Sequence, residues 1–217
     1  MVSSPLLPLL FSMSFFLVPT HSQETVLPKF PTSFTATLTI TANLLPKDTT
    51  YPPRVKTLSL SYSLPLNSAL VSSPTHTHVR HYQTEDEYLV KHGTYPSCQR
   101  SHLPTSMPEP TLPAATHVGS AVHGGVPAEH YIHDIGVERV HMYFSHDLPL
   151  ALVHEQYNIT TGAATALMTY EYSDVQVVED GDWEEEAFDV PGYGRSECEL
   201  HVGGYPYMHL WHHYLRV

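Results

Sequence analysis

The chain has 217 residues, and its 10 Lys and Arg against 22 Asp and Glu give a formal net charge of −12 with histidine neutral. So few basic residues disfavour a nucleic-acid-binding protein, which needs a basic patch or stripe on its surface. The 19 prolines, 14 tyrosines and only 15% charged residues disfavour long helices and favour an all-β protein.

The N-terminal residues predict a secretory signal peptide. Leu6–Val18 is mostly apolar, with the length of a signal-peptide core and too few residues to cross a bilayer as a helix. Thr20 and Ser22 are the small residues that precede a cleavage site, so we expect a signal peptide at 1–22. No basic residue precedes the apolar run, which leaves a simple apolar tail as the alternative. About 195 residues would follow, enough for one domain at 23–217, secreted or in the endomembrane lumen.

The first half of the mature chain predicts several short strands separated by turns. Strict alternation of apolar and polar residues is typical of a strand with one buried face. This pattern predicts strands at Phe34–Thr41 and Thr57–Leu64. Four further segments are candidate strands, at His76–Gln83, Glu87–His92, His117–Val122 and Glu129–Ile135. The stretch Tyr95–Pro113 holds five prolines and is expected to be an extended loop.

The second half carries the clearest pattern, an antiparallel meander within Gly124–Pro191. Three long β-type segments follow one another with short, turn-rich joints, at Val137–Phe144, Leu148–Tyr157 and Ala164–Val178. In the first segment alternate residues would share one face, and they are Val140, Met142 and Phe144. Such a sheet must cover its apolar face with a helix, a second sheet or a ligand.

Two motifs fit a secreted chain. Cys98 and Cys198 are the only cysteines, and an even count in an oxidising compartment predicts a disulfide. Its loop of roughly 100 residues would stabilise the fold by about 4–5 kcal/mol in chain-entropy models. Two buried free thiols are the alternative. Asn158 begins the Asn-Ile-Thr sequon beside a Thr-Thr-Gly turn, which predicts N-glycosylation.

The sequence offers little support for catalysis. It lacks a Gly-x-Ser-x-Gly elbow, a His-Glu-x-x-His motif and a phosphate-binding loop, so we expect no catalytic residue and no cofactor. A metal site built from Cys198, His201, His209, His212 and His213 is the weaker alternative, because Cys198 is needed for the disulfide. The 17 histidines outnumber the net negative charges, so acid would reverse the sign of the net charge.

Short motifs in the second half resemble the lipoprotein-carrier (LolA-like) superfamily and its secreted ependymin-type relatives. They are, in order, Gly125, His130-Tyr131, Val140–Phe144, Leu148-Pro149, Thr165–Val178 and Phe188-Asp189-Val190-Pro191. The resemblance implies an all-β fold with minor α content, a strongly curved antiparallel sheet forming a half-barrel. It also implies that the concave side holds helices or an apolar ligand, and it transfers no functional residues.

We therefore expect a secreted, glycosylated, non-catalytic carrier of hydrophobic or amphiphilic ligands. The side chains expected to line its pocket alternate along three strands and are Leu58, Leu60, Tyr62, Val140, Met142, Phe144, Met168, Tyr170 and Tyr172. Aliphatic, Met and Tyr side chains with few charges suit an acyl chain, although they equally suit an ordinary core. The alternatives are an extracellular adhesion or matrix-type interaction module without a small ligand and, more distantly, a histidine-based metal-binding protein.

Overall fold

A computed structural model describes residues 27–50, 52–112, 114–158, 160–179, 181–184 and 186–202. The predicted signal peptide and His209, His212 and His213 lie outside these residues. The described part folds into twelve strands and one 3-10 turn, namely β1 (Ser33–Ala42), β2 (Val55–Ser63), β3 (Ser68–Ser72), β4 (His76–His81), β5 (Asp86–Lys91), β6 (Ser97–His102), β7 (Thr116–His123), β8 (Val126–Ile135), β9 (Glu138–Ser145), β10 (Leu148–Tyr157), β11 (Ala164–Val177), η1 (Arg195–Glu197) and β12 (Glu199–Leu200). None of its helices is long and apolar enough to cross a membrane.

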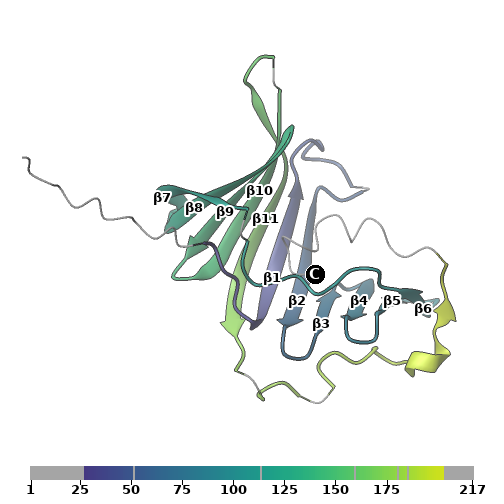
Figure 1. Ribbon diagram of the computed structural model, residues 1–217. Coiled ribbons are helices and arrows are strands. Elements are labelled where there is room, and N and C mark those ends of the chain that lie inside the picture. Colours follow the sequence, from purple (N-terminus) through teal and green to yellow (C-terminus); the bar gives the residue numbers. More distant parts are fainter. Residues whose placement is uncertain are drawn as a thin grey trace, which may run out of the picture.

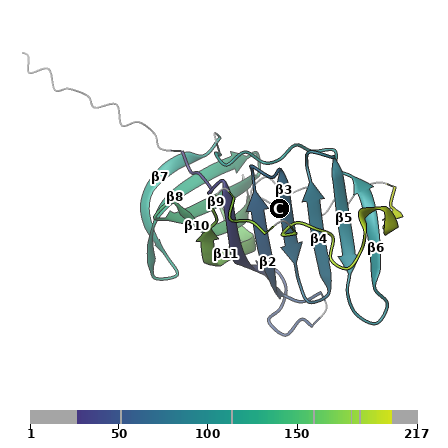
Figure 2. The same cartoon turned by 90° about the horizontal axis from the view of Figure 1, so that it is seen from below.

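All twelve strands belong to one curved sheet. Their spatial order is β12-β6-β5-β4-β3-β2-β1-β11-β10-β9-β8-β7, and every pairing is antiparallel except that of β12 with β6. β1 joins two meanders, because it pairs with β2 on one side and with β11 on the other (Figure 1). Seen from below, β7 to β11 curl away from the flatter β2 to β6 (Figure 2). The expected all-β half-barrel is therefore confirmed.

Most strands lie where alternation predicts them, with three additions. β3, β6 and β12 were not predicted, and β6 lies inside Tyr95–Pro113, so the prediction of a continuous loop there was wrong. The prolines at 96 and 104 flank β6 without interrupting it, which leaves its amides free to pair with β5, as in the pair Val90 and Cys98. Helical content in the described chain is limited to the single 3-10 turn η1.

The main core lies on the concave face, where the chain covers its own sheet. The segment between β6 and β7, described at 103–112 and 114–115, crosses this face, and we call it the strap (Figure 1). Its buried side chains are Leu103, Met107, Leu112 and Ala115, which join the cluster formed by the apolar faces of β1, β2, β9 and β11. Backbone hydrogen bonds fasten the strap to the N-terminal residues: the Phe30 amide donates to the Pro110 carbonyl at 2.9 Å.

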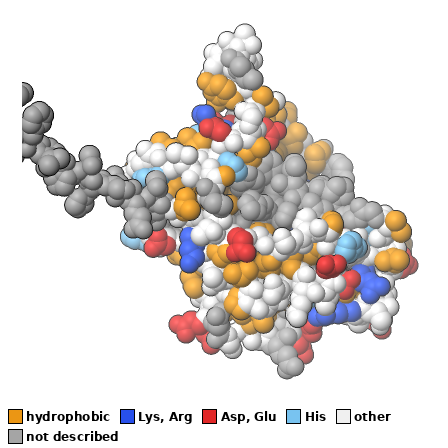
Figure 3. All heavy atoms as spheres, in the orientation of Figure 1, with side chains coloured by type: hydrophobic (Ala, Val, Ile, Leu, Met, Phe, Trp, Pro, Cys, Tyr) orange, Lys and Arg blue, Asp and Glu red, His pale blue; other side chains and the backbone are white. Residues whose placement is uncertain are grey.

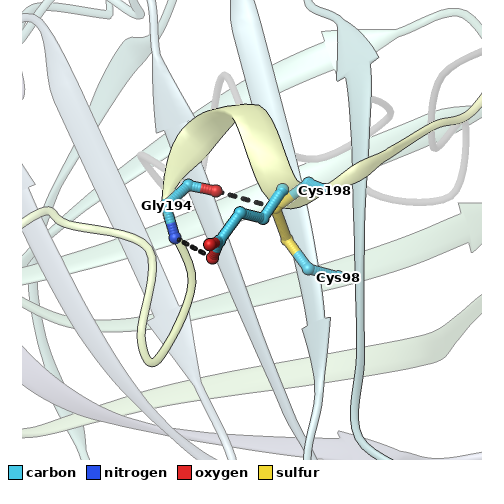
Figure 4. Close-up of a disulfide and its surroundings, with 4 residues drawn as sticks. Cys98, Gly194 and Cys198 are labelled. Atoms are coloured by element: carbon cyan, nitrogen blue, oxygen red, sulfur yellow. Dashed lines mark hydrogen bonds between the residues drawn. A yellow bond between two sulfur atoms is a disulfide. The ribbon is translucent and has the colours of Figure 1, made fainter.

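A second, smaller core lies on the convex face of β3 to β6. After β11 the chain returns along this face toward β6, and Val190 and Cys198 pack against Val79, Tyr88 and Val90. The Cys98–Cys198 disulfide, with a Cα–Cα distance of 4.7 Å, anchors this return segment to β6 just after η1 (Figure 4). The predicted disulfide is thus confirmed, and the return segment is held as the outer layer of this half of the sheet.

Candidate ligand-binding site on the concave face

All nine residues predicted to line a pocket lie on the concave face. The strand register explains this, because Leu38 pairs with Leu58 on one side and with Tyr172 on the other, so alternate residues of each strand share the face. Leu58 and Met168 are partly exposed. The other seven are buried, namely Leu60, Tyr62, Val140, Met142, Phe144, Tyr170 and Tyr172.

The chain itself contacts much of this predicted lining. The Tyr62 hydroxyl donates a hydrogen bond to the Pro108 carbonyl of the strap at 2.6 Å. The Phe30 ring packs edge-on against Phe144, with 5.3 Å between centroids, and also contacts Tyr172. Burial raises the pKa of Tyr170 to about 12, so its hydroxyl is neutral at physiological pH. The centre of the concave face is therefore packed core, and open space for a ligand must lie beside the strap.

One cavity of about 570 Å³ lies on the concave face. It is found at one edge of this half of the sheet, where β1, β3 and β5 end and β2 and β4 begin. Its apolar side chains are Ile40, Leu58, Val71 and Leu89, contributed by β1, β2, β3 and β5. Its polar side chains include Lys56, His76 and His78. Leu58 is the one residue of the predicted set that lines this cavity, since the others lie farther along the strands. The space-filling view shows hydrophobic side chains gathered where the strap crosses β2 and β3, away from this cavity (Figure 3).

A buried ionic cluster adjoins this cavity. The His78 Nε2 lies 3.3 Å from the Glu87 Oε2, and the Arg80 Nε lies 3.6 Å from the same oxygen. Arg80 and Glu87 are 1% and 0% exposed, so both charges are removed from water. The register of β4 and β5 places Arg80 directly opposite Glu87. Sequence reasoning missed the cluster, although charged residues at the inward positions of two adjacent strands were a signal that could have indicated it.

A second cavity of about 610 Å³ lies between the N-terminal described residues and the strand ends of the other meander. Phe30 and Pro31 form one wall, while Tyr131, Phe144 and Val177 form part of the other. Phe144, from the predicted set, therefore lines this space. Its rim also carries Lys29, His146 and Asp147, so charged groups of both signs lie at its mouth.

The convex face of β7 to β10 carries a row of imidazole and phenol rings. Tyr143 stacks on both His123 and His130, with centroid distances of 4.5 and 4.7 Å. The His130 Nε2 lies 2.9 Å from the His141 Nδ1, and the His141 Nε2 lies 3.0 Å from the Glu155 Oε2. Burial, with a smaller effect of His141, lowers the pKa of His130. Sequence reasoning assigned this row no role.

The remaining predicted sites fall at the surface or outside the described residues. Within the described ranges no three His, Cys, Asp or Glu side chains are placed to hold a metal ion. Cys198 is bonded to Cys98, which removes it as a metal ligand. Asn158 is exposed between β10 and β11, and its side-chain oxygen accepts from the amides of Thr160 and Thr161. Its glycosylation stays a prediction.

Comparisons with known proteins bear on the fold alone. The chain matches no protein-family model, and no curated protein matches it. Among solved structures, an uncharacterized conserved protein from Thermus thermophilus matches 79% of this chain and 90% of its own, at 10% identity and a TM-score of 0.52. This likeness supports the curved-sheet architecture, and it gives no information about function.

Two further solved structures match more weakly. MucB in complex with MucA(peri) matches at 11% identity and a TM-score of 0.36, over 79% of this chain and 57% of that chain. PNGF-II matches at 6% identity and a TM-score of 0.38, over 78% of this chain and 31% of that chain. At such TM-scores neither likeness supports a shared function.

Proposed function

We propose that this protein is a secreted or lumenal, non-catalytic carrier that binds an amphiphile with a single acyl chain, on a fold of the LolA-like kind. The observation that carries the proposal is the 570 Å³ cavity on the concave face, lined by Ile40, Leu58, Val71 and Leu89. That volume lies within the range of sites that bury small ligands. The disulfide is consistent with an oxidising compartment.

The polar side chains of the cavity favour an anionic headgroup. Lys56 and His76 line the cavity and are exposed, so they can approach a carboxylate or phosphate without being desolvated beforehand. An acyl chain would contact Leu58 and its apolar neighbours, while the headgroup remained beside Lys56 at the mouth. Burial of each methylene would contribute about 0.8 kcal/mol. Affinity should therefore rise with chain length until the cavity is full.

A fluorescent fatty acid titrated into delipidated protein tests this proposal. We expect saturable binding by the wild type and a loss of at least tenfold in affinity for Leu58→Glu, because the new carboxylate would lie in the apolar part of the cavity. Ser59→Glu is the matched control, since Ser59 is the next residue of β2, is exposed on the convex face and does not line the cavity. If both variants fold and bind the fatty acid with equal affinity, the proposed site is wrong.

Headgroup recognition has its own test. Lys56→Gln should weaken binding of the fatty acid more than binding of the corresponding fatty alcohol, because only the acid carries a negative charge.

Absence of saturable binding to any of these amphiphiles would favour the second candidate function, an extracellular interaction module. The observation that favours this alternative is the row of rings on the convex face, where Tyr143 stacks between His123 and His130.

A further inference from the structure

A separate, polar pocket of about 220 Å³ lies on the convex face. It is on the other side of the sheet from the 570 Å³ cavity proposed to hold an acyl chain, which we call the acyl cavity. Its inner wall is formed by Ser68 at the start of β3 and His81 at the end of β4, together with the turns that flank these strands. Its outer wall is formed by residues of the return segment, which the disulfide anchors, namely Glu184, Phe188, Asp189 and Arg195. The volume is below that of sites for drug-sized ligands, so it suits about one ring.

His81 is the central feature of this pocket, because one of its ring nitrogens is a buried acceptor without a partner. The side chain is 7% exposed, and its Nε2 has no hydrogen-bond partner among the described residues. The Ser68 Oγ donates its only hydrogen to the Leu66 carbonyl at 3.0 Å, so it must accept from the His81 Nδ1 at 3.2 Å. This arrangement fixes the proton on Nδ1 and leaves Nε2 with a free lone pair.

The charge around His81 argues for a neutral ligand. Burial lowers the pKa of His81, and the positive charge of Arg195 lowers it further, so the ring is neutral at pH 7. Arg195 also disfavours an ammonium ligand beside the imidazole, whereas Glu184 and Asp189 disfavour an anion. A buried acceptor usually has a partner, and here the partner that fits is a hydroxyl group that donates to Nε2.

The rest of the lining fits a molecule with several hydroxyl groups and an apolar edge. The polar side chains include the amides of Asn67 and Gln83 and the hydroxyl of Thr84, which both donate and accept hydrogen bonds. Leu66 and the buried Phe188 provide apolar contact for C–H groups. We propose that this pocket binds a saccharide unit, one of whose hydroxyls donates to the His81 Nε2. Its other hydroxyls would form hydrogen bonds with the charged side chains of Glu184, Asp189 and Arg195.

Backbone amide NMR of isotope-labelled protein can test this site with methyl glycosides of glucose, mannose and galactose and with N-acetylglucosamine. We expect saturable shifts, localised to β3, β4 and residues 186–195, for at least one of these sugars. His81→Phe keeps the ring volume and removes both nitrogens, so it should weaken binding at least tenfold. His76→Phe is the matched control, because His76 lies at the other end of β4 on the opposite face and is exposed.

Further variants keep the test decisive if His81→Phe does not fold. Glu184→Gln and Arg195→Gln change exposed side chains of the pocket and should each weaken binding at least threefold. Leu58→Glu should leave sugar binding unchanged, because it alters the acyl cavity on the other face. No saturable shift with any sugar up to about 10 mM, ten times a dissociation constant of about 1 mM, would overturn the proposal. Tighter binding of ethanolamine or acetate than of every sugar would also overturn it.

Discussion

At the scale of single residues, the buried pair Arg80 and Glu87 has the largest expected effect on stability. Both side chains are almost completely removed from water and lie opposite each other on β4 and β5. Arg80→Met would leave the Glu87 carboxylate in the core without its guanidinium. Removing one partner of a buried ion pair costs about 3–5 kcal/mol. We expect a loss of that size in the free energy of unfolding, measured by urea denaturation.

The matched control is Arg139→Met on the convex face. Arg139 pairs with Asp134 at 2.6 Å, but the two side chains are 33% and 62% exposed. Solvent screens such a pair, so its removal should cost about 1 kcal/mol or less. A loss at Arg80→Met no larger than at Arg139→Met would mean that the ionic cluster does not stabilise the sheet.

At the scale of elements, the strap depends on a few specific contacts. The Tyr62 hydroxyl donates to the Pro108 carbonyl at 2.6 Å, and both groups are buried. Tyr62→Phe keeps the ring in the core but leaves that carbonyl without its donor, which costs about 1–3 kcal/mol. We expect this loss in thermal or urea unfolding, with faster hydrogen exchange along the strap. Tyr95→Phe, at a position 83% exposed, should change neither quantity.

The return segment depends on the disulfide. Cys98 and Cys198 are 100 residues apart in sequence, and a cross-link of that span stabilises a fold by about 4–5 kcal/mol in chain-entropy models. The double variant Cys98→Ser, Cys198→Ser should lose stability of this order. Its hydrogen exchange should increase most over residues 186–202, whereas β1, β10 and β11 should stay protected. Uniformly increased exchange would show instead that the whole sheet depends on the bridge.

At the scale of the whole molecule, local patterns predict strands better than they predict what covers them. Alternation in Phe34–Thr41 and Val140–Phe144 identifies both the strands and their buried faces, because the side-chain period of a strand is two. The strap was not predictable in this way. Its proline-rich sequence indicates an extended loop, and only the folded sheet determines that Met107 and Leu112 pack on the concave face.

The two pockets illustrate the same limit. Eight of the nine predicted lining residues lie outside the acyl cavity, because alternation selects a face of the sheet and cannot tell covered positions from open ones. Leu58 lines the cavity because it lies near the strand end that the strap leaves uncovered. The polar pocket joins His81 to Arg195, which are distant in sequence and meet through the return of the chain along the convex face. No local motif indicates such a contact.

The pH dependence of stability also belongs to the whole molecule, because two histidines on different parts of the sheet contribute in the same direction. The pKa of His81 is lowered by burial and by Arg195, against the opposing effects of Asp189 and Asp86. The pKa of His130 is lowered by burial and by His141 and His117, against the opposing effect of Glu155. Above about pH 7.5 both rings are neutral in the folded and the unfolded chain, so their protonation does not change the free energy of unfolding there.

As the pH falls through about 6.5, the unfolded chain binds protons at these two positions before the folded protein does, so the free energy of unfolding decreases. We therefore expect His81 and His130 to make the protein less stable at pH 5.5 than at pH 7.5 in urea denaturation. His81→Phe and His130→Gln should each lose less stability over this interval than the wild type, because each removes one site of differential protonation. His76→Gln, at an exposed position, is the control and should retain the wild-type slope. If both variants retained the wild-type slope as well, protonation of these two rings would not be the cause of any acid sensitivity.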